Sequence, residues 1–130
     1  MLLLLSYDRV RTMTIPRILL IDDLRDFRDA RDCIIARTSA EALEFLKLGG
    51  EFDEIWFDHD LGLLANGVPD TTMVIVDFLS ELAYNGTLYP VGLVYVHTSN
   101  PVGGKQIAAS LENYGYVVRR VYAGDFFISN

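Results

Sequence analysis

Apolar residues occur in short continuous runs, and several stretches between these runs repeat apolar residues every three or four positions. A short apolar run bounded by polar or turn-forming residues is typical of a strand that is buried on both faces. Five such runs predict five strands, at residues 16–21, 32–36, 54–57, 91–96 and 116–121.

Three of the intervening stretches predict helices, at residues 38–49, 70–86 and 100–115. In each, apolar side chains recur at helical spacing and form one inward face. Thr38 begins the first helix with the spacing of a capping box. Asp70 is a suitable N-cap for the second helix, because a short acidic side chain can accept hydrogen bonds from the first turn.

Strands that alternate with helices predict an α/β domain with a parallel sheet and right-handed crossovers. Residues 24–30 leave room for only a short helix, and residues 61–69 predict a loop rich in glycine, asparagine and proline. Few residues follow the fifth strand, so we expect the final helix to be missing or very short. We expect one domain over residues 15–130.

Residues 1–14 form a leader whose structure the sequence leaves open. The apolar run Met1–Leu5 has no basic residue before it and is too short for a signal peptide. An extra strand, a disordered leader, and a start at Met13 instead of Met1 all remain open.

The net negative charge of the chain limits the classes of partner that it could bind. A net charge of −7 argues against binding to duplex nucleic acid or to an anionic membrane. A small phosphorylated ligand is compatible with this charge if local cations or a metal offset the carboxylates. Cys33 is the single cysteine and lies in an apolar run, so we expect a buried, inert thiol and a cytoplasmic location.

Polar side chains that could take part in catalysis or ligand binding follow three of the predicted strands. In open α/β sheets, ligands bind beyond the carboxyl ends of the strands. Both histidines of the chain lie at such ends, close to four carboxylates. The candidate site residues found in this way are Asp22, Asp23, Asp58, His59, Asp60, His97, Thr98, Ser99 and Asn100.

Each candidate also has a structural interpretation. Aspartates after strands often cap a helix or shape a turn, and a lone histidine is often a structural hydrogen-bonding residue. Ser99 has no G-x-S-x-G elbow around it, which weakens a role as nucleophile. Two histidines beside four carboxylates nevertheless favour a functional site.

The turn at residues 100–105 has features of an anion site. It is not a Walker A motif, because Gln106 stands where serine or threonine is required. Asn100 is expected to cap the following helix. Free N–H groups at a helix N-terminus, the small residues Gly103 and Gly104, and the nearby Lys105 would favour a phosphate. A plain helix start with flexible glycines is an equal alternative.

Residues 16–121 resemble response-regulator receiver domains. The resemblance rests on the acidic pair Asp22-Asp23, the run A-R-T-S-A-E-A-L-E-F-L after the second strand, and F-D-E-I-W-F-D ending at Asp58. It implies a doubly wound, five-stranded parallel sheet in the order 2-1-3-4-5, with helices on both faces. In receivers the acidic pair holds Mg²⁺ and the third aspartate accepts a phosphoryl group.

The departures from this pattern resemble a divergent branch, the cyclic-phosphate-processing receiver-like family. Receivers have a lysine at the end of the fifth strand, where this chain offers Arg119 and Arg120. They also lack the D-H-D triplet at residues 58–60 and the H-T-S-N-P run at residues 97–101. The resemblance implies histidine chemistry on a cyclic phosphate in place of phosphoacceptance.

The leading hypothesis is therefore a phosphoesterase that acts on a cyclic phosphate. His59 and His97 would be its acid and base, since imidazole is the side chain that titrates nearest neutrality, and Asp60 would orient one of them. Mg²⁺, a hard cation suited to oxygen ligands, would be held by Asp22, Asp23 and Asp58. The phosphate would bind at Ser99, Asn100, Gly103, Gly104 and Lys105.

Two other hypotheses compete with this one. A non-catalytic receiver-like module would bind a nucleotide or a protein, and the missing final helix favours it. That gap leaves a sheet face uncovered near the fifth strand, where a homodimer could form. A phosphoacceptor domain would use Asp58, with Lys105 in place of the missing lysine.

Overall fold

The computed structural model describes residues 15–128. The prediction of a leader falls on residues 1–14, which lie outside the described residues.

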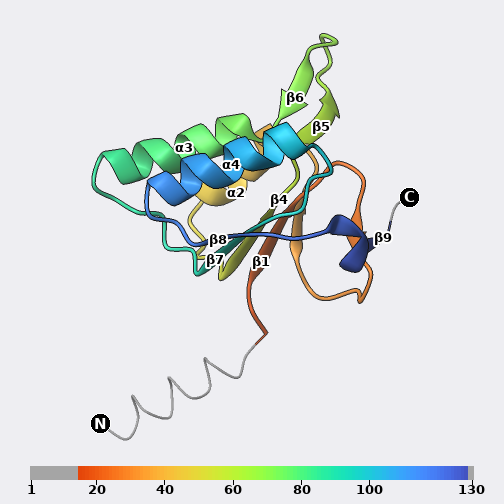
Figure 1. Ribbon diagram of the computed structural model, residues 1–130, viewed down its shortest axis with the longest axis horizontal. Helices are drawn as coiled ribbons and strands as arrows, with labels where there is room; N and C mark the ends of the chain where they lie inside the picture. Colours follow the sequence, from red (N-terminus) through yellow and green to blue (C-terminus); the bar gives the residue numbers. More distant parts are fainter. Residues whose placement is uncertain (1–14, 129–130) are drawn as a thin grey trace, which may run out of the picture.

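A five-stranded parallel sheet forms the centre of the molecule (Figure 1). Its order is β3-β1-β4-β7-β8, which is 2-1-3-4-5 when only these strands are counted, and the predicted receiver order is confirmed. The register places Leu20 beside Trp56 and Trp56 beside Tyr95. The strands are β1 (Ile18–Ile21), β3 (Ile34–Ala36), β4 (Glu54–Phe57), β7 (Leu93–Val96) and β8 (Val118–Arg120).

The three α-helices of the described residues lie on one face of this sheet (Figure 1). They are α2 (Ser39–Lys47), α3 (Met73–Tyr84) and α4 (Pro101–Asn113). Their inward side chains, such as Leu46, Leu79 and Leu111, pack on Leu19 and Ile55. Because successive strand residues point to opposite faces, the other half of each strand faces away from the helices. Within residues 15–128, the second face carries no α-helix, so the expectation of helices on both faces is not met there.

Short segments from both ends of the domain cover the second face. They are β2 (Asp26–Phe27), the 3-10 helix η1 (Ala123–Asp125) and β9 (Phe127–Ile128), and β2 pairs with β9 in antiparallel fashion. Phe27 and Phe127 stack on each other at 4.7 Å between ring centroids, and both contact Trp56. The short helix expected at residues 24–30 is absent, because extended backbone carries Phe27 onto the sheet. Among the described residues after β8, the only helical segment is η1, which agrees with the expectation of a final helix that is missing or very short.

Cys33 packs at the edge of the apolar cluster that Phe27, Trp56 and Phe127 form on the second face. Its side chain is half-buried instead of fully buried, and burial raises the pKa of the thiol.

A β-hairpin replaces the loop expected at residues 61–69. Its strands are β5 (Asp60–Leu63) and β6 (Pro69–Thr71), and it projects from the carboxyl edge of the sheet (Figure 1). A hydrogen bond from the Leu64 N–H to the Val68 carbonyl closes the turn, where Gly67 has a φ of +82°. Glycine adopts this left-handed conformation without strain, which explains how a segment that reads as a loop forms a hairpin.

Asp70 does not cap α3, contrary to the sequence prediction. The residue before α3 is Thr72, and Asp70 is buried in β6. Its carboxylate accepts hydrogen bonds from the Ser39 backbone N–H at 2.9 Å and from the Ser39 hydroxyl at 2.6 Å. Asp70 thus serves the first turn of a different helix, α2, and joins it to the hairpin.

Replacement of Asp70 by alanine is expected to lower the free energy of unfolding by about 1–3 kcal/mol, since the Ser39 donors would stay buried without an acceptor. Asp77→Ala, on the exposed surface of α3, is the matched control and is expected to change stability by about 0.5 kcal/mol or less. Urea unfolding measures both variants. Equal stability of the two would show that the link between Asp70 and α2 contributes nothing.

None of the helices in the described part of the chain has the length and apolar content needed to cross a membrane. The homodimer expected near the fifth strand stays a prediction; β8 is an edge strand of the sheet there, and Val117 and Tyr122 beside it are exposed.

Candidate functional site

Asp22, Asp58 and His97 directly follow the three central strands of the sheet. The Asp58 N–H donates to the Ile21 carbonyl at 2.9 Å, and the His97 N–H donates to the Phe57 carbonyl at 3.0 Å. These bonds continue the ladder one residue beyond the strands, so the three side chains start from fixed backbone. One ligand atom from each of the three lies within 4.8 Å of the others, and all three residues are buried.

The Asp22 carboxylate is held on both of its oxygens. Oδ1 accepts hydrogen bonds from the backbone N–H groups of Leu24 and Arg25, and Oδ2 lies 2.9 Å from Nε2 of His97. Burial alone would raise the pKa of Asp22, but the hydrogen bonds from His97, Arg25 and Leu24 outweigh it and lower the pKa. Asp22 is therefore a buried, ionised group with a fixed orientation.

The pKa of Asp58 is shifted in the opposite direction from that of Asp22. Burial raises its pKa, and the neighbouring charge of Asp22 raises it further. Its Oδ1 accepts a hydrogen bond from the His59 N–H at 2.8 Å, and its backbone carbonyl accepts one from the Thr72 hydroxyl at 2.7 Å. Two buried carboxylates in one cluster favour a cation between them.

His97 is the third member of this cluster and is fully buried. Its ring is 4.5 Å from the Phe127 ring and 6.1 Å from the Trp56 ring, between centroids. Nε2 contacts Asp22, while Nδ1 is buried and has no hydrogen-bond partner. A buried ring nitrogen without a partner is unusual and is one observation that a functional role would explain.

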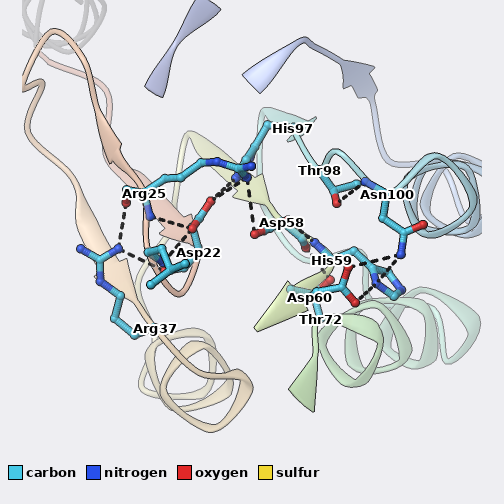
Figure 2. Close-up of polar contacts among 11 residues, drawn as sticks. Asp22, Arg25, Arg37, Asp58, His59, Asp60, Thr72, His97, Thr98 and Asn100 are labelled. Atoms are coloured by element: carbon cyan, nitrogen blue, oxygen red, sulfur yellow. Dashed lines mark hydrogen bonds and ion pairs between the residues drawn. The ribbon is translucent and has the colours of Figure 1, made fainter. Parts of the chain in front are cut away.

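His59 belongs to a second polar group, drawn on the other side of Asp58 from Asp22 and His97 in Figure 2. Its Nδ1 lies 3.1 Å from Asp60 Oδ1, and the Asn100 side chain contacts both His59 and Asp60. A Cβ on Gly103 would lie 2.5 Å from the imidazole, so the ring occupies space that only glycine leaves free. These contacts involve Nδ1 of the ring and leave Nε2 without a hydrogen bond among the described residues.

A pocket of about 160 Å³ opens above the buried cluster. Neither imidazole lines it. Asp23 lies at the pocket, although it is not part of the close cluster with His97. The lining residues are Asp22, Asp23, Leu24, Arg25, Asp58, Asp60, Thr98 and Ser99.

At the N-terminus of α4, Asn100, Gly103 and Gly104, which were predicted to bind an anion, contact other residues of the protein. Asn100 caps the helix, as expected, by accepting a hydrogen bond from the Gly103 N–H at 3.0 Å. Gly104 makes room for the Arg120 guanidinium and the Thr98 methyl group. Lys105 is exposed. A role of these residues in phosphate binding stays a prediction.

Sequence reasoning missed Arg25. Its Nη1 lies 3.5 Å from Asp22 Oδ2 and 3.6 Å from Asp58 Oδ2, and Figure 2 shows its side chain reaching toward both. The Arg37 guanidinium donates to the backbone carbonyls of Asp22 and Arg25. The sequence feature that could have indicated Arg25 is its position as a basic residue three positions after Asp22. The expectation of a short helix at residues 24–30 kept it from being considered.

A family model described as the cyclic-phosphate processing receiver domain matches residues 17–113. Comparison with curated proteins and with solved structures gave no significant match.

Proposed function

Because the chain belongs to the family of cyclic-phosphate processing receiver domains, we propose that it hydrolyses a cyclic phosphate ester at the carboxyl edge of its sheet. The observation that carries this proposal is the buried cluster of Asp22, Asp58 and His97 beneath a small polar pocket. Ligand pockets usually measure 300–1,000 Å³, so a pocket of about 160 Å³ suits the phosphate end of a ligand whose remainder lies outside.

A divalent cation suits the cluster. Two carboxylates and one imidazole within 4.8 Å can reach one ion, and a cation would relieve the repulsion that raises the pKa of Asp58. Asp22, Asp23 and Asp58 would be an all-oxygen set for Mg²⁺, whereas a set with His97 suits Mn²⁺ better, since imidazole favours transition metals. Such a cation would supply neutralisation of the phosphate charge.

Ring opening needs one proton taken from water and one given to the departing oxygen, as water bonds to phosphorus and one P–O ester bond breaks. His59 is suited to proton transfer, because Asp60 holds Nδ1 and leaves Nε2 for the ligand. His97 is buried and reaches the pocket only through Asp22, so it holds that carboxylate in place. A second proton-transfer role for His97 would require its ring to become accessible.

A non-catalytic module that binds a cyclic phosphate is the second candidate. The position of both imidazoles outside the pocket lining favours it. This module would retain the same ligand without converting it.

Incubation with 2′,3′-cyclic mononucleotides, 3′,5′-cyclic mononucleotides and cyclic oligonucleotides, each with Mg²⁺ or Mn²⁺, tests the proposal by chromatography. We expect a linear product from at least one class, and retention without conversion would support the binding module.

Asp58→Asn is expected to abolish both the product and the heat of metal binding in calorimetry. Asp53→Asn, a surface change at the opposite end of the sheet, is the control. Metal binding that survives in Asp58→Asn would make the carboxylate structural.

A further inference from the structure

Arg25 occupies the position between the two buried carboxylates of the cluster. Its backbone is fixed on both sides, since its N–H donates to Asp22 Oδ1 at 2.8 Å and its carbonyl accepts from Arg37 Nη1 at 2.8 Å. Its side chain then extends to Asp22 Oδ2 and Asp58 Oδ2. Among the residues that line the pocket, Arg25 is the only basic one.

The contacts of this guanidinium are longer than those of the other arginine–aspartate ion pairs within residues 15–128. Arg25 lies 3.5 Å and 3.6 Å from its two carboxylates, whereas the Arg31–Asp29 and Arg37–Asp26 pairs each measure 2.7 Å. Charge-assisted hydrogen bonds are strong at about 2.7–2.9 Å. The Arg25 side chain is also 21% exposed, so it can leave this position without crossing the core.

The charge of the pocket makes a single guanidinium insufficient for a phosphate. Four carboxyl groups line the pocket beside Arg25. A phosphate that entered this pocket would be repelled unless a further cation neutralised part of that charge. A divalent cation and the Arg25 guanidinium would require the same Oδ2 atoms of Asp22 and Asp58.

We propose that Arg25 is a displaceable counter-ion: it neutralises Asp22 and Asp58 until a divalent cation takes these carboxylates, and its guanidinium then binds the phosphate in the same pocket. The inference rests on the proposed function for the metal and the phosphate. It makes phosphate binding depend on prior metal binding, because only the metal frees the guanidinium. Arginine suits the second role, since its planar fork matches two phosphate oxygens.

Calorimetric titration with Mn²⁺ alone, followed by titration of the Mn²⁺-loaded protein with inorganic phosphate, tests this inference. Arg25→Gln is expected to bind Mn²⁺ on the order of tenfold more tightly than wild type, because it removes a competing cation. The same variant is expected to bind phosphate on the order of tenfold more weakly. Arg25→Lys keeps the charge but not the planar fork. Its affinities for Mn²⁺ and for phosphate are expected to lie between those of wild type and Arg25→Gln.

Arg119→Gln is the control for the change in net charge, since Arg119 is exposed on β8 and away from the pocket lining. Thermal unfolding shows that each variant is folded, and Mn²⁺ is expected to raise the melting temperature of Arg25→Gln more than that of wild type. Unchanged Mn²⁺ affinity in Arg25→Gln, or unchanged phosphate affinity, overturns the inference. So does the absence of Mn²⁺ binding by every variant. These titrations contain no cyclic phosphate, so failure of the proposed hydrolysis is observed separately.

Discussion

Replacement of His59 by glutamine is expected to lower the turnover of a cyclic phosphate by roughly 10²–10⁴-fold, the usual contribution of one positioned proton-transfer group. Glutamine keeps a polar side chain beside Gly103 but cannot exchange a proton at neutral pH. The affinity for the ligand is expected to change much less, because His59 does not line the pocket that would hold the phosphate. Steady-state kinetics together with ligand binding by calorimetry measure the two effects.

Asp60→Asn provides a graded comparison for the His59 variant. Asp60 contacts His59 Nδ1 at 3.1 Å and is therefore a positioning residue, so its loss is expected to slow turnover less than the loss of the imidazole. His97→Gln is a different kind of variant, because it removes the imidazole contact of the buried Asp22 carboxylate and is expected to destabilise the fold. Full activity of His59→Gln would remove His59 from the mechanism.

Replacement of Phe127 by alanine is expected to lower the free energy of unfolding by about 3–5 kcal/mol, as for other buried aromatic side chains. Phe127 is 4% exposed and contacts the rings of Phe27, Trp56 and His97. Its removal opens a cavity in the second face of the sheet. Trp56 is the single tryptophan, so its fluorescence during urea unfolding reports on the cluster that is changed.

Ile128→Ala is the matched control for the Phe127 variant. Ile128 is the neighbouring residue in β9, pairs with Asp26, and is 47% exposed, so its truncation is expected to cost about 1 kcal/mol or less. A loss below about 1 kcal/mol in Phe127→Ala as well would mean that β9 contributes little to the core.

The centre of the sheet was predictable because β1 and β4 are buried on both faces and therefore appear in the sequence as continuous apolar runs. The helices that face it were predictable from their caps and periodicity. The second face was not, because β2 and β9 are two residues long and pair across the whole domain. No local pattern marks such a pair, and Phe27 and Phe127 are single aromatic residues whose partners are distant in sequence.

The candidate site was predictable where it depends on the ends of strands. Asp22, Asp58 and His97 each follow a strand of the sheet, and the structure brings them together. The contacts of Arg25 depend on the extended path of residues 24–30, which sequence reasoning assigned to a helix. The role of Asp70 depends on the hairpin that delivers it to Ser39. Both residues were misjudged because tertiary contacts override local caps and propensities.

The pairing of β2 with β9 has a consequence for biosynthesis. Chains emerge from the ribosome from the N-terminus, and domains fold as their segments become available. The central sheet and the helices α2, α3 and α4 precede residue 121, whereas Phe126 and Phe127 are synthesised later. The helical face can therefore assemble while Trp56 and His97 are still uncovered. The aromatic wall behind His97 is thus completed only when Phe127 leaves the exit tunnel, later than the sheet edge that carries Asp22 and Asp58.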